Sequence, residues 1–279
     1  MGEQLCSVVI PAHDEAAGIT DVLSRLAPLG DDLEIIVVAN GCTDATAELA
    51  RAAAPNCEVV ELEIGSKPGA LNEGDRRATV FPRLYLDGDI RIQPEEIEAM
   101  IDALSQEGVI AVGSTPVHDL SNSSWVVRSA YRIITEMTTN RVGLGGANPQ
   151  MLSRQARERF GEWPDVIGDD YFLDGLFDER EAVRSPAVES VRVAPTGFLD
   201  CVSRKARIQA GNTAVIDAGL RAPHSGGGLG EAVRVVRRRP ALAIHLPAHV
   251  SIAVAGRLLH RWRRFRGRDG VFYRDSSRA

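Results

Sequence analysis

The sequence predicts an α/β fold, with a Rossmann-like, mostly parallel sheet flanked by helices and a helical extension at the C-terminus. Over the first 115 residues, short apolar runs rich in β-branched residues alternate with amphipathic helical patterns. This alternation is typical of parallel strands joined by crossover helices. The composition agrees, because 44% hydrophobic and 25% charged residues over 279 positions are ordinary for a globular protein that buries a sizeable core.

Local patterns place the elements in order. We expect strands where apolar runs are short and β-branched, over residues 5–10, 33–38, 58–62, 83–86 and 109–113. Helices are expected between them, where apolar residues recur every three or four positions, over residues 19–26, 45–54, 69–78 and 94–104. In the second half we expect helices over 121–140 and 169–177, a glycine-rich loop over 143–147 and a strand over 187–194.

Charge is distributed unevenly along the chain. The formal net charge of −6 gives no reason to expect a nucleic-acid partner. Residues 231–279 nevertheless contain twelve arginines and three acidic residues, a net charge of +9, so residues 1–230 carry −15. A basic segment of this kind favours contact with anions such as lipid head groups. The four cysteines have no zinc-site spacing and indicate buried thiols in a reducing compartment.

Four short segments lie where an expected strand, or the loop after it, gives way to a helix. The sharpest is residues 84–90, LYLDGDI, which place Asp87 and Asp89 on either side of Gly88 at the end of a strand. Mg²⁺ is usually held by one or two such carboxylates together with substrate phosphates. A polar turn that closes the strand would explain the same residues.

The other three segments carry polar side chains at the same kind of position. Residues 8–15 end in a His-Asp-Glu run, residues 37–44 contain Asn40, and residues 66–72 place Lys67 in a Gly/Pro turn. A lysine at a helix N-terminus suits a phosphate group. Each segment also has a purely structural explanation. The acids of residues 8–15 can begin the following helix, Asn40 can belong to a turn dipeptide, and Lys67 can be a solvated loop lysine. Because ligands of such sheets bind at the carboxyl ends of the strands, we expect the four segments to converge there.

In their order along the chain, these segments resemble the motifs of the family 2 glycosyltransferases of the GT-A fold. Residues 8–15 are similar to V-V-I-P-x-x-N-E, residues 37–44 to V-V-D-D-G-S-x-D, residues 67–72 to K-x-x-A-L-N and residues 87–89 to D-x-D. The resemblance continues through a Gly-Gly pair at 145–146, Gly-Asp-Asp at 168–170 and a basic run at 204–207. It covers about residues 5–215, and the closing residues 274–278 also resemble tails of actinobacterial polysaccharide glycosyltransferases.

The resemblance implies a role for each matching position. It implies that a nucleotide sugar is bound by Pro11, His13, Glu15, Asn40, Lys67, Asp87 and Gly88, and that Asp89 with Asp87 holds Mg²⁺ or Mn²⁺. The positions implied on the side of the acceptor or the diphosphate are Gly145, Gly146, Asp169, Arg204 and Arg207. Asp170 corresponds to the general base of the family. The chain departs from the family motifs at Asp14, Ala39 and Asn40, where the nucleobase would lie, so the resemblance names no particular nucleotide.

The residue types on the proposed acceptor side can also be interpreted without the resemblance. Asp169 and Asp170 open an expected helix whose next residues are aromatic or apolar, which suits a general base, although an ordinary acidic first turn explains them equally well. Arg204 and Arg207 either stabilise charge on a diphosphate leaving group or form a solvated face. The run at 204–207 lacks the tryptophan of the processive synthases' Q-x-x-R-W, which favours transfer of a single sugar.

We expect a GT-A domain over residues 1–224, with a nucleotide-sugar-binding part over 1–115 and an acceptor part over 116–224. A linker is expected over 225–230 and a basic helical tail over 231–279. The apolar stretch 241–256 is shorter than the ~20 residues that a membrane-spanning helix needs. An interfacial helix pair on an anionic leaflet fits better, and the alternative is a helical pair packed on the acidic body.

From the resemblance we expect an inverting, divalent-metal-dependent glycosyltransferase that moves one sugar from a nucleotide-diphosphate sugar to an acceptor hydroxyl. A sugar or lipid-linked acceptor in cell-surface or exopolysaccharide assembly would place it in the cytoplasm, peripheral at the inner face of the plasma membrane. One alternative is a sugar-nucleotidyltransferase, which would need a Gly-rich basic loop in place of residues 13–15. The other is a non-catalytic nucleotide-sugar-binding subunit of a polysaccharide assembly complex.

Overall fold

The computed structural model describes residues 4–139, 143–146, 148–222 and 228–267. The chain forms two compact units that are not contiguous in sequence. Unit 1 comprises Met1–Thr115, Val142–Asp165 and Leu173–Ser190, and unit 2 comprises Pro116–Arg141, Val166–Phe172 and Val191–Ala279.

The first elements of the chain all belong to unit 1. They are β1 (Cys6–Ala12), α1 (Ile19–Leu26), η1 (Ala27–Asp32), β2 (Leu33–Asn40), α2 (Thr46–Ala53), β3 (Glu58–Leu62), α3 (Lys67–Arg77), β4 (Arg83–Tyr85) and α4 (Pro94–Leu104). Later in the chain, unit 1 also contains β6 (Gln150–Leu152) and α6 (Arg154–Arg157).

Three elements have residues in both units, and the remaining helices belong to unit 2. The shared elements are β5 (Ala111–Asp119), α7 (Asp169–Asp174) and β7 (Ala182–Val193). The helices of unit 2 are α5 (Trp125–Thr139), α8 (Phe198–Asp217), α9 (Leu229–Arg238), η2 (Pro240–His245) and α10 (Leu246–Phe265).

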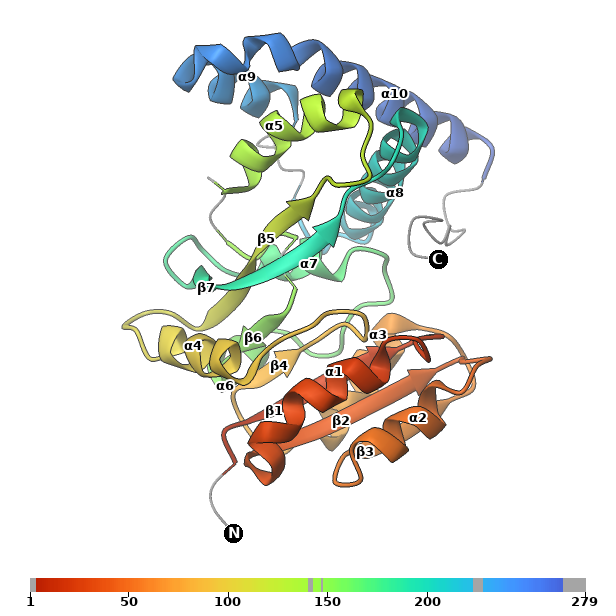
Figure 1. The fold of residues 1–279 in the computed structure, drawn as a ribbon, viewed down its shortest axis with the longest axis vertical. Coiled ribbons are helices and arrows are strands. Elements are labelled where there is room, and N and C mark those ends of the chain that lie inside the picture. The colour runs from red at the N-terminus through yellow and green to blue at the C-terminus, as the bar shows by residue number, and fades with distance from the viewer. Residues whose placement is uncertain (1–3, 140–142, 147, 223–227, 268–279) are drawn as a thin grey trace. The chain divides into compact units, whose positions relative to one another are not determined.

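Among the described residues, seven strands form one sheet in the order β3-β2-β1-β4-β6-β5-β7 (Figure 1). The first four strands in this order are parallel, and β1 and β2 pair in register over seven residues, from Cys6 opposite Leu33 to Ala12 opposite Ala39. The short strand β6 is antiparallel to β4 and β5. The predicted α/β fold with a mostly parallel sheet is confirmed, and β6 makes the sheet mixed.

Helices cover both faces of the sheet of unit 1. Side chains of α1, α2 and α4 share one core cluster with Val8 and Ile10 of β1. On the other face α3 packs against β1 and β2, so closely that a Cβ on Gly74 would lie 2.2 Å from Cγ1 of Val9. Since Val8 and Val9 are both fully buried, β1 needs apolar residues on both sides, which explains its continuous hydrophobic run.

A buried carboxylate ties α3 to β4 and α6 within unit 1. Oδ1 of Asp75 accepts hydrogen bonds from Nη1 of Arg83 at 2.6 Å and from the Tyr85 hydroxyl at 2.8 Å. Oδ2 accepts from Nε of Arg157 and Nε1 of Trp163, both at 2.8 Å. Four donors from three parts of the chain therefore converge on one carboxylate that is only 9% exposed.

The C-terminal helices α9 and α10 belong to unit 2. In unit 2, α10 packs against α8 and α5, and its buried side chain Ile252 joins a cluster with Val127 and Tyr131 of α5 and Cys201 of α8. Of the expected linker, residues 225–227 lie outside the described residues, whereas Leu229 already begins α9. The C-terminal helical extension is thus present, with α10 in contact with α5 and α8.

The stretch Pro240–Phe265 is the candidate membrane span found among the described residues. Its 26 residues have a mean hydropathy of 1.4 in the most apolar window, of which 22% is buried. It is longer than the 16 residues expected from the apolar pattern, because the helix continues through the arginine-rich residues 257–265. Core helices of soluble proteins satisfy the same criteria, and one face of α10 is buried on α8 and α5.

Candidate active site

The carboxyl ends of β1, β2 and β4 lie next to one another at one edge of the sheet of unit 1, because these strands are parallel neighbours. The N–H of Leu86 donates to the carbonyl of Val9 at 3.0 Å and so carries the chain beyond β4 alongside β1. Gly88 then lies against the loop after β1, where a Cβ on Gly88 would be 3.2 Å from Cγ of Glu15. The structure therefore brings the segment 87–89 to the segment 11–15, as the sequence predicts.

Lys67 and Asp87 form an ion pair at this edge. Ser66 caps α3 by accepting a hydrogen bond from the N–H of Gly69 at 3.1 Å, which places Lys67 at the first position of the helix. Nζ of Lys67 lies 2.8 Å from Oδ1 of Asp87. The two side chains are 39% and 33% exposed, so solvent reaches the pair. Asp89 follows in an exposed turn, so Lys67, Asp87 and Asp89 contribute one ammonium group and two carboxylates to this edge.

Asn40 joins three segments at the same edge. Its Nδ2 donates to the carbonyl of Ala12 at 2.7 Å, and its Oδ1 accepts from the N–H of Ser66 at 3.0 Å. Its backbone carbonyl lies 2.7 Å from Nδ1 of His13. The side chain is only 3% exposed, so its amide fixes the ends of β1 and β2 to the start of α3, whereas His13 is exposed. Pro11 is buried within β1 itself, opposite Val38.

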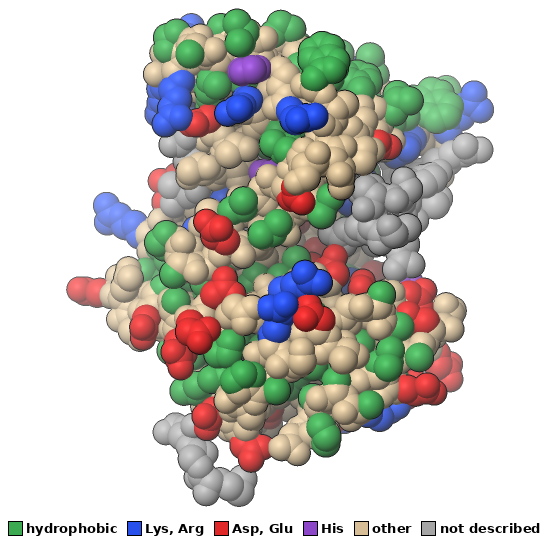
Figure 2. Space-filling view, viewed as in Figure 1, with side chains coloured by type: hydrophobic (Ala, Val, Ile, Leu, Met, Phe, Trp, Pro, Cys, Tyr) green, Lys and Arg blue, Asp and Glu red, His purple; other side chains and the backbone are tan. Residues whose placement is uncertain are grey.

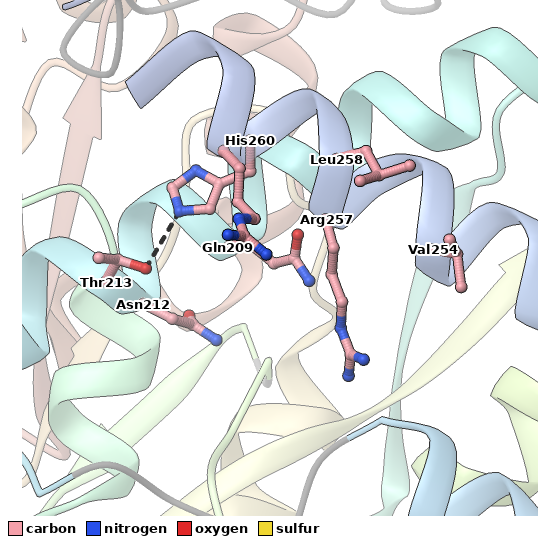
Figure 3. Close-up of a pocket in the computed structure, with 8 residues that line it drawn as sticks. Gln209, Asn212, Thr213, Val254, Arg257, Leu258 and His260 are labelled. Carbon is pink, nitrogen blue, oxygen red and sulfur yellow. Dashed lines mark hydrogen bonds between the residues drawn. The ribbon is translucent and has the colours of Figure 1, made fainter. Parts of the chain in front are cut away.

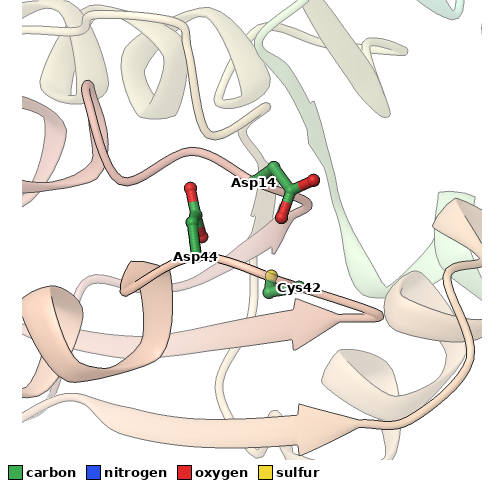
Figure 4. Close-up of side chains that lie close together, drawn as sticks. All are labelled: Asp14, Cys42 and Asp44. Carbon is green, nitrogen blue, oxygen red and sulfur yellow. The ribbon is translucent and has the colours of Figure 1, made fainter.

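Asp14, Cys42 and Asp44 form a cluster whose potential metal-binding atoms all lie within 4.8 Å of one another (Figure 4). Oδ1 of Asp14 accepts from the N–H of Thr43 at 2.7 Å, and this bond lowers the pKa of Asp14. Asp44 accepts from the N–H of Thr46 at 3.0 Å and from its hydroxyl. Burial opposes ionisation of Asp44, but these bonds lower its pKa overall. Because both carboxylates accept hydrogen bonds from the loops around them, the cluster fixes those loops to one another.

The glycine-rich loop is held by two side chains that sequence reasoning missed. The N–H of Gly145 donates to Oδ1 of Asp174 at 2.6 Å, and Nη2 of Arg184 donates to the carbonyl of Gly145 at 2.6 Å. Gly143 and Gly146 have φ values of 88° and 71°, a conformation that L side chains rarely adopt. No local sequence pattern predicts that Asp174 and Arg184 bind this loop, because the residues that they contact are 29 to 41 positions away in the chain.

The segment that carries Asp169 and Asp170 is held in place within unit 2. Gly168 has a φ of 127°, and a Cβ on Gly211 of α8 would lie 2.5 Å from the carbonyl oxygen of Ile167. Glycine at both positions lets the start of α7 contact the backbone of α8. Oδ1 of Asp170 accepts from the N–H of Tyr171 at 2.8 Å.

Unit 2 also contains the predicted residues Arg204 and Arg207 and a third arginine, Arg221. Arg221, which sequence reasoning also missed, donates from Nη1 to the carbonyl of Tyr171 at 2.6 Å and stacks on that ring with Cζ 4.1 Å from its centroid. Arg204 donates from Nη1 to the carbonyl of Val193 at 3.0 Å, and Arg207 follows one turn later on α8. The arginines predicted at 204 and 207 thus lie on a long helix that has no counterpart among the expected elements.

Comparison with known proteins identifies the family. Residues 7–169, more than half of the chain, match the sequence model described as Glycosyl transferase family 2. An undecaprenyl-phosphate 4-deoxy-4-formamido-L-arabinose transferase from Edwardsiella ictaluri is 30% identical over 149 residues, which cover 50% of this chain and 45% of that protein. The transferase of the same name from Pseudomonas paraeruginosa is 34% identical over 119 residues, covering 39% and 35%. The chain thus spans less than half the length of these curated relatives.

Solved structures show the same fold. A mannosyltransferase from Pyrobaculum calidifontis, in complex with GDP-Man and Mn²⁺, is similar with a TM-score of 0.60 and 21% identity, over 94% of this chain and 76% of that one. A glucosyl-3-phosphoglycerate synthase from Mycobacterium tuberculosis, in complex with Mn²⁺, UDP and glucosyl-3-phosphoglycerate, has a TM-score of 0.54 and 21% identity, over 82% and 84%. The fold is therefore the GT-A α/β fold. Because the matched residues 7–169 make up more than half of the chain and include β1, β2, β4 and the loops that converge at their carboxyl ends, the chain belongs to glycosyl transferase family 2.

Proposed function

We propose that this protein is an inverting, divalent-metal-dependent glycosyltransferase that transfers one sugar from a nucleotide-diphosphate sugar to an acceptor hydroxyl. The observation that carries the proposal is the ion pair between Lys67 and Asp87, 2.8 Å apart, beside Asp89 at the carboxyl edge of the parallel strands. An ammonium group at the start of a helix attracts phosphate, whereas a pair of carboxylates attracts a hard cation. The two together are complementary to a diphosphate with its metal ion.

Asp87 and Asp89 would hold Mg²⁺ or Mn²⁺. The donor set fits these ions, because carboxylate oxygens are their preferred ligands and the few protein ligands leave positions for phosphate oxygens. The cation, when bound, supplies positive charge that stabilises the diphosphate as it leaves the sugar. Lys67 adds a second positive charge on the same side. The solved relatives that were crystallised with Mn²⁺ support this assignment.

Asp170 is the proposed general base, on the strength of the motif order in which it follows Asp87 and Asp89. Its carboxylate would take the proton of the acceptor hydroxyl, so that the oxygen attacks the anomeric carbon on the face opposite the leaving group. Attack from that face inverts the configuration of the sugar. Gly145, Gly146, Asp169, Arg204 and Arg207 are proposed to border the acceptor or the diphosphate.

We further propose a lipid-linked acceptor and a peripheral position at the inner face of the plasma membrane, in cell-surface or exopolysaccharide assembly. The curated relatives are named for transfer to undecaprenyl phosphate, a membrane lipid, which supports an acceptor of this class. The basic C-terminal residues and the apolar stretch Pro240–Phe265 support contact with an anionic leaflet.

Titration calorimetry with UDP and with GDP tests the donor site. We expect the preferred nucleotide to bind at least tenfold more tightly in the presence of Mn²⁺ than in the presence of a chelator, because the metal neutralises the diphosphate. Asp89→Asn should remove this difference, whereas Asp102→Asn, an exposed position on α4, should behave as the wild type. Equal affinity with Mn²⁺ and with chelator in the wild type would overturn the metal assignment.

A further inference from the structure

A groove between α8 and α10 in unit 2 is lined by none of the residues assigned above. Its volume is about 450 Å³, and its lining includes Gln209 and Asn212 of α8 and Arg257 and Arg261 of α10 (Figure 3). Nε2 of His260 lies 3.3 Å from the hydroxyl of Thr213 across one end of it. The lining, taken over the described residues, contains two guanidinium groups and no carboxylate.

Positive charge is concentrated around this groove. A Cβ on Gly256 would lie 2.7 Å from Cγ of Lys205, so the Lys205 side chain lies against α10. Burial lowers the pKa of Lys205, the nearby Arg257 lowers it further, and Glu231 partly compensates. Lys205 is therefore close to Arg257, which lines the groove together with Arg261. An anion bound in the groove would relieve their mutual repulsion.

An exposed apolar ridge runs along α10 beside the groove. It consists of Val254, Leu258, Trp262 and Phe265, which are 41%, 62%, 48% and 87% exposed. Their spacing of three or four residues places them along one side of the helix, away from the side buried on α8 and α5. Val254 and Leu258 also line the groove. Figure 2 shows hydrophobic and basic side chains interspersed over α9 and α10.

We propose that the groove binds the phosphate of an anionic lipid head group while the ridge enters the acyl boundary of the same leaflet. The proposal rests on the proposed function only for the presence of a membrane. Guanidinium groups bind phosphate through paired hydrogen bonds, which suits Arg257 and Arg261. A water-soluble phosphate would gain nothing from the four exposed apolar side chains, whereas a lipid at a bilayer surface meets the groove and the ridge together.

Co-sedimentation with vesicles tests the proposal with two matched double variants. Arg257→Gln with Arg261→Gln removes the charges of the groove, and Arg264→Gln with Arg266→Gln removes the same charge at the C-terminal end of α10, outside the groove. Arg264 is paired with Asp217 at 3.0 Å and Arg266 lies over the ring of Trp262, so neither lines the groove. We expect the wild type to bind phosphatidylcholine vesicles that contain phosphatidylglycerol, and to bind pure phosphatidylcholine weakly.

Both double variants lose two positive charges, so the long-range attraction to the anionic vesicles should weaken by a similar factor in both. Beyond this shared loss, the groove variant should lose roughly tenfold more affinity for the anionic vesicles than the control variant. Equal losses would show general electrostatic attraction and overturn the groove. Absence of binding by the wild type would overturn the whole proposal. Arg261→Gln alone, at an exposed position, repeats the test with less disturbance, and thermal melting verifies that each variant folds.

Inorganic phosphate separates a lipid site from a site for soluble anions. It should release the protein from the vesicles no more than sodium chloride of equal ionic strength does, and stronger release would assign the groove to a soluble phosphate instead. Calorimetric binding of nucleotide with Mn²⁺ should be the same in both double variants, because the donor-side residues lie in unit 1. Absence of nucleotide binding in the wild type would contradict the proposed function and leave the vesicle result intact.

Discussion

Asp14 shows how a single side chain can depart from a family motif and still perform its structural task. It is the one non-glycine residue with positive φ, 52°, among those that the structure describes. Asparagine and aspartate tolerate this conformation because their short side chains hydrogen-bond locally. Asp14 does so by accepting from the N–H of Thr43. An aspartate can therefore stand where the family motif has asparagine without changing the backbone of the loop.

We expect Asp14→Ala to destabilise the protein and Asp14→Asn to leave it close to the wild type. Alanine keeps the unfavourable φ and loses the hydrogen bond to Thr43, a combination that costs about 1–3 kcal/mol. Chemical denaturation of the three proteins measures the difference. A change below about 0.5 kcal/mol for the alanine variant would mean that the loop does not depend on this side chain.

Replacement of Asp170 by asparagine tests the proposed base. The asparagine side chain keeps the size of the aspartate but cannot take a proton, so kcat should fall by ~10²–10⁴-fold while donor affinity stays nearly the same. Steady-state kinetics and calorimetry provide the two measurements. If kcat stays within about threefold of the wild type, the base lies elsewhere, and Asp169 is then the next residue to replace.

At the residue scale, the sequence was informative where a chemical group stands at the end of a strand. The convergence of Glu15, Lys67 and Asp87 at one sheet edge follows from the parallel order of the strands, which the apolar pattern predicts. Asp174 and Arg184 could not be found in this way, because they act on a loop that is distant in sequence and contact it through its backbone. Every residue of the loop has a backbone carbonyl, and nearly every residue has an N–H, so the loop sequence does not indicate which side chains bind these groups.

At the scale of elements, the main omission is α8. Its 20 residues include small buried residues such as Ala206 and Gly211, so the helix lacks the large apolar stripe by which α1 and α4 were predicted. The short elements β6 and α6 have only three and four residues, too few to show a periodic pattern. Strands and helices with a strong local pattern, such as β3 and α1, begin and end where the sequence predicts.

Helix α3 depends on its buried charge network, and we expect Asp75→Ala to be strongly destabilising. The variant leaves the guanidinium groups of Arg83 and Arg157 without the carboxylate that both of them contact in the folded unit. Removing one partner of a buried ion pair costs about 3–5 kcal/mol. Asp102→Ala, at an exposed position on α4, is the control. Equal unfolding midpoints for the two variants would show that the network contributes little.

Two histidines of unit 2, the half-buried His118 and the buried His249, should make the stability of the protein sensitive to acid. Burial, with the charges of Arg192 and Arg204, lowers the pKa of His118 to about 4, and burial with Lys205 lowers that of His249 to about 4. The unfolded chain, with an ordinary histidine pKa of about 6.5, binds protons that the folded protein excludes. The contribution of the two neutral histidines to the free energy of unfolding is therefore fully present above pH 6.5. It falls as the pH is lowered towards 4, by on the order of 1 kcal/mol per histidine.

Thermal melting between pH 7 and pH 5 measures this effect. The double variant His118→Asn with His249→Asn should show a flatter dependence of the melting temperature on pH than the wild type. Carboxylates such as Glu181, whose pKa is lowered to about 2 by Arg159, titrate at lower pH and leave this window largely unaffected. Parallel pH profiles for the two proteins would contradict the assignment to the histidines.

At the scale of the whole molecule, the sequence places the donor-side residues and the C-terminal helices in different parts of the chain. The structure assigns the first group to unit 1 and α9 and α10 to unit 2. What the pattern could not predict is the return of the chain to unit 1 for residues 142–165 and 173–190. Contiguous parts are the simplest expectation from sequence, whereas strands such as β5 and β7 carry the chain from one unit to the other.

Removal of residues 230–279 is expected to affect the two units differently. Without α10, the surfaces of α5 and α8 that contact Ile252 and Gly256 become exposed, so the melting temperature of unit 2 should fall. Nucleotide binding should persist, since Lys67 and Asp87 belong to unit 1. Differential scanning calorimetry and nucleotide titration of the shortened chain measure both effects. Loss of nucleotide binding with an unchanged melting profile would contradict this division of tasks.

The contact between Lys67 and Asp87 has a thermodynamic consequence for ligand binding. In the ligand-free protein Nζ of Lys67 contacts Oδ1 of Asp87, so a phosphate that binds Lys67 and a cation that binds Asp87 each compete with this contact. Either ligand alone therefore binds at the cost of weakening the contact, and the second ligand meets a contact that is already weakened. Metal and nucleotide should be positively cooperative, and by reciprocity each raises the affinity of the other by the same factor. In Lys67→Met that factor should shrink, while the free metal binds more tightly than it does to the wild type.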